Sequence, residues 1–171
     1  LDGLVHCLAF AGKEELIGDY SSTSSDGFAR ALEISAYSLA PLCKYAKPLF
    51  SEKAGGLTLT YLGADRAIPN YNVMGIAKAA LEASVRYLAA DLGPRGIRVN
   101  AIAPGYIETD FNRDFFATDR GKKMISRIPQ QRLGQMSDLD GALLLLAGDG
   151  SQYMTGSVIT IDGGHTLPLI D

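Results

Sequence analysis

Residues 57–81 read LTLTYLGADRAIPNYNVMGIAKAAL, and this run sets the architecture of the chain. An apolar, strand-like segment ends at Tyr61, a polar loop with one proline follows, and a helical pattern covers residues 72–92. Tyr71 and Lys78 are nearly two turns of α-helix apart, so their side chains lie on the same face. A phenol beside an ammonium can form an acid site, because the cation favours the phenolate and lowers the effective pKa of the tyrosine.

The spacing alone leaves two interpretations open. Because Tyr61 ends the strand shortly before Tyr71, we expect the two tyrosines and Lys78 to converge at the end of a strand as a catalytic group. The alternative is a tyrosine at a helix start and a lysine on a solvated face, and such pairs are common by chance.

The rest of the chain alternates strand-like and helical segments. Further strands are predicted at residues 4–10, 97–102 and 158–161, and further helices at about 26–47 and 137–148. Strands separated by helices predict an α/β fold with a parallel sheet and right-handed crossovers. Ligands bind such sheets at the carboxyl ends of the strands. The polar, irregular segment of about residues 105–132 is interpreted as a lid over that site.

A dinucleotide-binding fold opens with a strand, a glycine-rich turn and a helix. No strand of this chain is followed by such a turn, and Leu1 begins a strand-like run without an initiator Met. We therefore expect residues 1–171 to be the carboxyl portion of one Rossmann-type domain. Its doubly wound parallel sheet would lack the first strands and the glycine-rich dinucleotide loop.

Composition excludes several classes of function. A net charge of −3 without a basic run argues against nucleic acid as a partner. The longest apolar run, residues 142–147, is too short to span a bilayer, and no signal-peptide pattern opens the chain. Cys7 and Cys43 are interpreted as free thiols in a reducing compartment, which predicts a cytoplasmic protein. The Cys and His residues lack metal-ligand spacing, so we expect no metal.

Residues 1–6, 33–38, 59–83 and 96–102 closely resemble bacterial NADH-dependent enoyl-acyl-carrier-protein reductases of the divergent short-chain dehydrogenase type. The Tyr-x6-Lys spacing of Tyr71 and Lys78 is specific to that type, whereas ordinary short-chain dehydrogenases carry Tyr-x3-Lys. The resemblance implies reduction of a trans-2-enoyl thioester on acyl carrier protein in fatty acid biosynthesis, with NADH as cofactor. It also implies a homotetramer, and small side chains on a second face of the helix over residues 72–92 would permit such packing.

The resemblance assigns roles to individual residues. Tyr71 would hydrogen-bond the thioester oxygen, Tyr61 would be the second catalytic tyrosine, and Lys78 would bind the nicotinamide ribose. Ala11 would contact the substrate. The implied cofactor contacts, besides Lys78, are Leu8, Ile107, Glu108, Thr109, Asp110 and Phe111. For Leu8, Ala11 and Ile107, plain core packing explains the sequence equally well.

After about residue 103 the sequence resembles an ordinary short-chain dehydrogenase. Residues 104–109 read PGYIET, where enoyl reductases usually have Ala-Gly-Pro-Ile-Lys/Arg-Thr. This favours one alternative, a 3-oxoacyl or general alcohol or ketone reductase. The missing phosphate-binding loop favours another, an inactive oligomerisation fragment. The residue that selects NADH over NADPH would lie upstream of Leu1, so that preference stays open.

Overall fold

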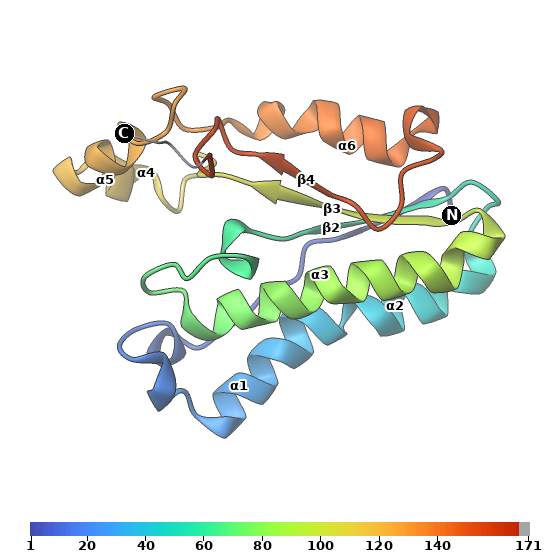
Figure 1. Ribbon diagram of the computed structural model, residues 1–171, viewed down its shortest axis with the longest axis horizontal. Coiled ribbons are helices and arrows are strands. Elements are labelled where there is room, and N and C mark those ends of the chain that lie inside the picture. The colour runs from blue at the N-terminus through green and yellow to red at the C-terminus, as the bar shows by residue number, and fades with distance from the viewer. Residues whose placement is uncertain (168–171) are drawn as a thin grey trace.

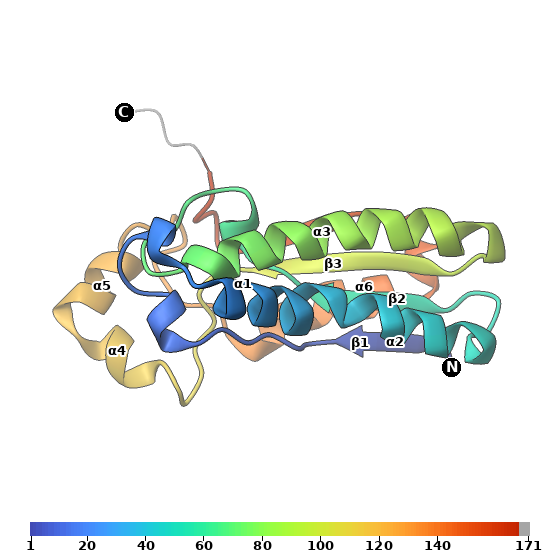
Figure 2. The same ribbon diagram turned by 90° about the horizontal axis from the view of Figure 1, so that it is seen from below.

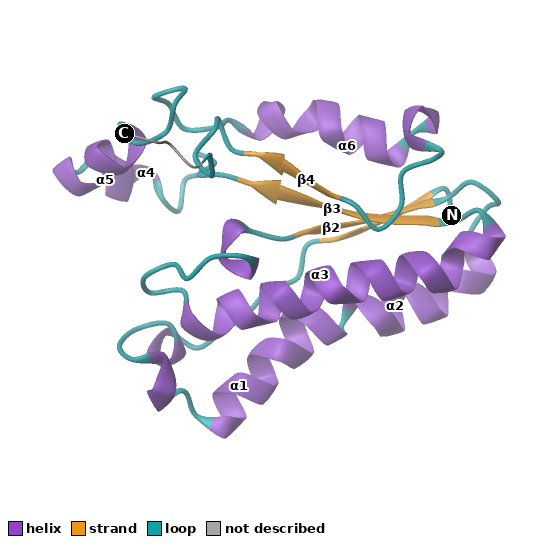
Figure 3. Cartoon of the chain, viewed as in Figure 1, coloured by secondary structure: helices purple, strands orange, loops and turns teal. Residues whose placement is uncertain are grey.

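The computed structural model describes residues 1–167 and contains a parallel sheet between helices. Within these residues the strands are β1 (Gly3–His6), β2 (Gly55–Leu59), β3 (Arg98–Pro104) and β4 (Val158–Ile161), which are neighbours in that order (Figures 1 and 3). The predicted α/β class and parallel sheet are confirmed. The predicted domain extends to Asp171, and residues 168–171 lie outside the described part of the chain.

The parallel register brings the loops that follow the strands to one edge. Val5 pairs with Leu57, Leu57 pairs with Asn100, and Ala101 pairs with Val158, so all the strands run in the same direction. The segments that follow each strand therefore leave from the same side of the sheet. Residues 7–10, which the sequence assigned to the first strand, belong to one of these segments.

Helices cover both faces of the sheet. On one face lie α1 (Ser25–Leu32), α2 (Leu39–Ala46) and α3 (Asn72–Leu92), and α6 (Asp140–Ala147) covers the other (Figures 1 and 2). The short helices α4 (Arg113–Ala117) and α5 (Asp119–Ile125) lie beyond the carboxyl edge, inside the segment predicted as a lid. Turns of 3-10 helix cover Lys13–Glu15, Tyr20–Ser22, Lys47–Leu49, Leu62–Ala64, Gly93–Arg95, Met136–Leu139 and Asp149–Ser151.

The single helix predicted over residues 26–47 is interrupted. A π-helical turn at Glu33–Tyr37 separates α1 from α2, and its inward residues Ser35 and Ala36 are buried. Such a turn inserts an extra residue into the helical ladder, which periodicity of apolar residues does not reveal. Ser35 uses this position to hydrogen-bond the backbone of Phe10, in the segment after β1.

The sequence of α3 explains its position. Val73, Ala77, Leu81 and Val85 recur every four residues and are fully buried, so the helix presents one continuous apolar stripe. Leu81 and Val85 of that stripe pack with residues of α2 and β3 in the larger core cluster. The helix stops at a 3-10 turn closed by Gly96, whose φ of 75° is left-handed.

The opposite face has a smaller core and a buried arginine. Leu57, Ile102 and Leu146 pack together between the sheet and α6. Arg98, at the start of β3, donates hydrogen bonds to the carbonyls of Leu146 and Gly148 at the end of α6. These bonds satisfy carbonyls that a helix end leaves without partners and fix α6 to the sheet.

No helix within residues 1–167 is long and apolar enough to cross a bilayer.

Candidate active site

Lys78 is a buried cation at the carboxyl edge of the sheet. Its place on the face of α3 that packs against β3 leaves it 7% exposed. Its Nζ donates a hydrogen bond of 2.8 Å to the carbonyl oxygen of Leu59, the last residue of β2. Burial lowers the pKa of Lys78, and the neighbouring Cys7 and Glu82 act in the opposite direction. The lysine therefore lies at the edge where parallel sheets bind ligands.

Tyr61 and Tyr71 come from different elements and meet at this edge. Tyr61 follows β2 and precedes the 3-10 turn Leu62–Ala64, and Tyr71 immediately precedes α3. Their rings pack edge to face, with centroids 5.0 Å apart and an interplanar angle of 65°. The two phenols are therefore held in one cluster, as the sequence predicts.

Two glycines allow this approach. A Cβ on Gly75 would lie 2.8 Å from the carbonyl oxygen of Gly63, a contact that the backbone cannot relieve cheaply. A Cβ on Gly63 would collide with the ring of Tyr71. Gly75 occupies the position that lysine takes in the Tyr-x3-Lys pattern, and here it faces backbone. The longer spacing to Lys78 therefore agrees with the local packing.

The predicted direction of the Tyr71 pKa shift is wrong. Burial raises the pKa of Tyr71 above its ordinary value. Burial also raises the pKa of Tyr61, and the neighbouring phenols of Tyr106 and Tyr71 add to that shift. Desolvation of the phenolate is the cause of the Tyr71 shift, and Lys78 does not contribute to either shift. Both tyrosines are therefore neutral hydrogen-bond donors at neutral pH.

The predicted contact residues after β1 lie in an open segment. Leu8 is 52% exposed, so plain core packing does not account for it within this chain. Ala11 is partly buried a few residues further on. Both follow the end of β1, whose last residue is His6.

Residues 107–111 form the turn that leads into α4. Ile107 makes a bridge with Gly134, and the backbone N–H of Thr109 donates to the Asn112 side chain. Glu108 and Asp110 both pair with the exposed guanidinium of Arg113. Phe111 is 98% exposed. The acidic groups of this turn are therefore engaged by Arg113.

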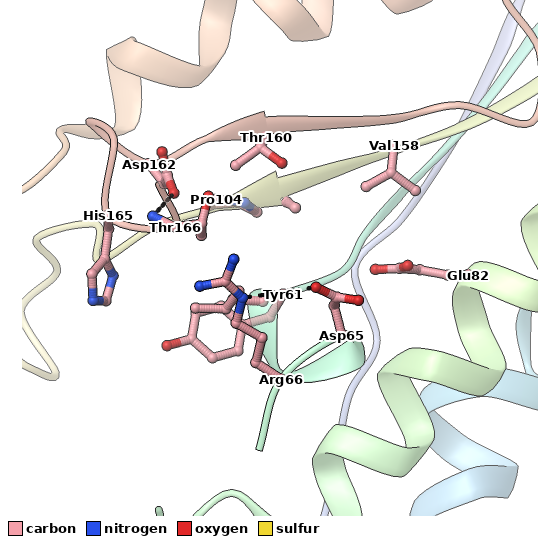
Figure 4. Close-up of a pocket in the computed structure, with 13 residues that line it drawn as sticks. Tyr61, Asp65, Arg66, Glu82, Pro104, Val158, Thr160, Asp162, His165 and Thr166 are labelled. Atoms are coloured by element: carbon pink, nitrogen blue, oxygen red, sulfur yellow. Dashed lines mark hydrogen bonds and ion pairs between the residues drawn. The ribbon is translucent and has the colours of Figure 1, made fainter. Parts of the chain in front are cut away.

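Sequence reasoning missed several residues around Tyr61. A cavity of about 280 Å³ beside Tyr61 is also lined by Asp65, Glu82, Asp162 and His165 (Figure 4). Figure 4 shows Glu82 and Asp65 on one side of Tyr61, and Asp162 and His165 on the other. The sequence contained one indication of Asp162 and His165, namely their position along the chain. The turn at residues 162–165 follows β4 just as Tyr61 follows β2.

A second cavity, of about 460 Å³, adjoins the first at His165 and carries positive charge. Its polar lining comes from Arg120 and Lys123 of α5, from Arg127, and from Tyr106 and His165. Its apolar lining is Ile68, Pro69 and Met124. The combination of cationic and apolar groups suits a ligand with an anionic end and an apolar body.

His6 is a buried histidine under this edge. It is 2% exposed, and its Nδ1 and Nε2 are hydrogen-bonded to the hydroxyls of Thr58 and Ser38 at 2.9 and 2.8 Å. Burial lowers its pKa, and the charge of Lys78 adds to that effect. The neutral ring links β1, β2 and the π-helical turn.

A protein-family model described as enoyl-(acyl carrier protein) reductase matches residues 1–166. The chain is 47% identical over 171 residues to the NADH-dependent enoyl-acyl-carrier-protein reductase FabI of Nostoc sp., covering 98% of this chain and 65% of that protein. It is 44% identical over 174 residues to the FabI of Bacillus subtilis, again covering 98% of this chain and 65% of the relative. The chain thus spans less than two thirds of the length of these curated relatives.

Solved structures agree with these matches. The crystal structure of the Bacillus cereus enoyl-acyl carrier protein reductase with NADP⁺ and indole naphthyridinone superposes with a TM-score of 0.90 at 43% identity. It is matched over 99% of this chain and 66% of that chain. The reductase of Anaplasma phagocytophilum in complex with NAD gives a TM-score of 0.89 at 40% identity, over 99% of this chain and 63% of the other. The Rossmann-type architecture predicted from the sequence is confirmed.

Proposed function

The chain belongs to the enoyl-acyl-carrier-protein reductase family, and we propose that the whole protein reduces the trans-2 double bond of enoyl-acyl-carrier-protein thioesters with NADH, in fatty acid biosynthesis. The observation that carries the proposal is the cluster of Tyr61, Tyr71 and Lys78 at the carboxyl edge of the sheet. The relatives named for this reaction are NADH-dependent.

The neutral phenol of Tyr71 is the group that stabilises the reacting thioester. Reduction at the β carbon moves electron density onto the thioester oxygen, where an enolate forms. A preorganised donor aimed at that oxygen lowers the barrier most, because charge develops there during the reaction. The raised pKa of Tyr71 keeps its O–H in place as that donor. Tyr61, packed against it, orients the ring and is the candidate proton donor.

Lys78 fits the cofactor. An ammonium carries three N–H donors, and the one acceptor that the described structure gives Lys78 is the carbonyl oxygen of Leu59. Its remaining donors suit the ribose hydroxyls of a nicotinamide nucleotide. When bound, NADH supplies the hydride. Leu8, Ala11 and the turn that contains Ile107, Glu108, Thr109, Asp110 and Phe111 stay the proposed contacts for the nicotinamide and the acyl chain.

The carrier-bound substrate is proposed to approach over the segment of residues 105–132. This segment contains α4 and α5 and lies beyond the carboxyl edge, where a lid would cover the tyrosines. The cations Arg120, Lys123 and Arg127 face the cavity there and suit an anionic carrier. Limited proteolysis tests the lid: NADH with an enoyl thioester should protect residues 105–132, and unchanged cleavage would remove the lid from the account.

We also propose that the whole protein is a cytoplasmic homotetramer. Ile76 and Tyr87 of α3 and Tyr45 of α2 are exposed apolar or aromatic side chains on the helical face of the molecule. Such a face is suited to packing against another copy. The free thiols Cys7 and Cys43 are typical of a reducing compartment. Light scattering should give four times the monomer mass, and a monomeric mass would exclude the tetramer.

A 3-oxoacyl reductase remains the second candidate, because residues 104–109 follow the ordinary short-chain dehydrogenase pattern. Turnover of a crotonyl thioester and of an acetoacetyl thioester, each with NADH, separates the two. The proposal requires NADH consumption with the crotonyl thioester and little with the acetoacetyl thioester. The opposite preference would establish the second candidate. Absence of both activities and of NADH binding would favour an inactive protein.

A further inference from the structure

The turn between β3 and α4 begins in a firmly held stretch of backbone. The ring of Tyr106 packs against that of His165, with centroids 4.8 Å apart. The N–H of Gly134 donates to the carbonyl of Tyr106 at 2.9 Å, and the N–H of Glu108 donates to the carbonyl of Gly134 at 2.8 Å. These contacts end one residue before Thr109, which is proposed above to contact the cofactor.

Thr109 is held from the other side of the turn. Its N–H donates to Oδ1 of Asn112 at 2.9 Å, and its carbonyl accepts from the backbone N–H groups of Asn112 and Arg113 at 3.1 Å each. The Nδ2 of Asn112 donates to the carbonyl of Ile107 at 2.8 Å. One carboxamide therefore bridges Ile107 and Thr109 and closes the turn.

The partners of the Asn112 side chain fix its orientation. A backbone N–H needs the amide oxygen, and a backbone carbonyl needs the amide nitrogen. A flipped carboxamide would set donor against donor and acceptor against acceptor, so only the orientation described satisfies both contacts. The side chain is thus engaged at both ends within a single turn.

This use of Asn112 differs from the usual role of asparagine at a helix start. Asn112 is the N-cap residue of α4, where an asparagine side chain typically accepts from an N–H two or three residues further on. Here the side chain makes no capping bond and reaches back to residues 107 and 109 instead. Its bonds therefore stabilise the turn before the helix.

The arrangement leaves the Thr109 hydroxyl available to a ligand. Within residues 1–167, the hydrogen bonds of Thr109 all use its backbone groups. A hydroxyl can donate and accept, which matches the carboxamide of a nicotinamide ring. The turn follows β3, and parallel sheets bind ligands at the carboxyl ends of their strands.

We propose that Asn112 is a positioning residue for the nicotinamide end of the cofactor: by bridging Ile107 and Thr109, it holds the Thr109 hydroxyl in place for the nicotinamide carboxamide. Without this bridge the turn has more conformations, and binding must bear the cost of ordering it. The inference rests on the function proposed above, because that function supplies the cofactor.

Three variants of the whole protein isolate this role. Asn112→Ala removes the bridge, and Thr109→Val removes the hydroxyl while keeping the shape of the side chain. The double variant completes a cycle, since losses that act through one contact are not additive. Gln152→Ala is the matched control, because Gln152 is an exposed carboxamide that also bonds a residue three positions earlier, Asp149.

Calorimetry measures the Kd of each protein for NADH and for ADP-ribose, the corresponding nucleotide without nicotinamide. Asn112→Ala and Thr109→Val should each raise the Kd for NADH about tenfold, the equivalent of one hydrogen bond. The double variant should match the single variants, because the contact is already lost. The Kd for ADP-ribose should stay at the wild-type value throughout, which also shows that the variants fold. Gln152→Ala should bind both ligands as the wild type does.

Several results would overturn the proposal. Wild-type NADH affinity in Asn112→Ala would show that the bridge is not needed, and an additive loss of about 100-fold in the double variant would show that Asn112 does not act through Thr109. Equal losses for NADH and ADP-ribose in Asn112→Ala would indicate a general structural effect. A wild type that binds NADH no more tightly than ADP-ribose would exclude a nicotinamide contact.

The same proteins separate this inference from the proposed function. A wild type that does not reduce a crotonyl thioester, but shows the expected pattern of NADH and ADP-ribose binding, would refute the enoyl reductase function and leave the role of Asn112 intact. A wild type that reduces the thioester, with unchanged NADH affinity in Asn112→Ala, would refute the role of Asn112 alone.

Discussion

The rings of Tyr61 and Tyr71 pack edge to face with their centroids 5.0 Å apart. Such a pair contributes about 0.5–1.5 kcal/mol beyond the area it buries. The contact joins the segment after β2 to the start of α3, the helix that carries Lys78. Because each ring supports the other, phenylalanine can replace either tyrosine without opening the packing, and the hydroxyls can be tested separately.

Replacing Tyr71 by Phe should lower kcat about 100-fold, because the donor to the enolate oxygen is lost while the ring remains. Tyr153→Phe is the control, since Tyr153 is fully exposed and lines neither cavity. Steady-state turnover of a crotonyl thioester measures both. Equal kcat values for Tyr71→Phe and the wild type would remove Tyr71 from the mechanism.

Replacing Lys78 by Met should weaken NADH binding and stabilise the fold. Burial lowers the pKa of Lys78, which means that the charged form is disfavoured inside the folded protein. Replacing a buried charge by an apolar side chain of similar length should raise the free energy of unfolding at pH 7 by roughly 1 kcal/mol. Loss of its donors should raise the Kd for NADH on the order of 10-fold.

Calorimetry with NADH and urea unfolding measure these two effects. The exposed Lys53, in the turn before β2, supplies the control variant Lys53→Met, which should change neither quantity. Unchanged NADH affinity in Lys78→Met would show that Lys78 does not contact the cofactor.

Two helical glycines make a matched pair. Gly141→Ala should stabilise the protein by up to about 1 kcal/mol, because a Cβ there meets open space and alanine favours helix. Gly75→Ala should destabilise it by about 1–3 kcal/mol, because the new Cβ presses on the Gly63 carbonyl. Urea unfolding gives both values. A stabilised Gly75→Ala would mean that the contact between α3 and the turn after β2 is not tight.

His6 should make stability fall in mild acid. Its folded-state pKa lies below its ordinary value because of burial and the charge of Lys78, so the unfolded chain binds the proton more readily. The free energy of unfolding therefore stays level above about pH 6.5 and decreases as pH drops below that value, until the folded state is protonated too. Urea unfolding at pH 8 and pH 5 should show a smaller decrease in His6→Gln. An equal decrease in both proteins would contradict this origin.

The sequence predicts the parallel sheet and the meeting of Tyr61 with Tyr71 because both follow from local patterns. Alternating strands and helices imply parallel order, and the spacing from Tyr71 to Lys78 implies one helix face. The interruption at residues 33–37 was missed, since a π-helical turn changes hydrogen bonding without changing apolar periodicity. The Tyr71 pKa direction was wrong, since burial comes from chain segments distant in sequence.

The Tyr106–His165 contact was also beyond local patterns. These residues are far apart in the chain and meet only because β3 and β4 are neighbours in parallel register. The sequence makes Gly105 the first residue of the predicted lid segment and does not indicate what it faces. The close approach that Gly105 permits to Asp162 becomes visible only in the fold.

Hydride transfer itself provides the most direct test of the central claim, that Tyr61, Tyr71 and Lys78 form an enoyl reductase site. The whole protein is given NADH that carries transferable deuterium, together with equal amounts of crotonyl and acetoacetyl thioesters, and the products are identified by NMR. The account predicts a saturated butyryl thioester with deuterium on the β carbon, and little such product from Tyr71→Phe. A deuterated 3-hydroxybutyryl thioester without any saturated product would contradict it.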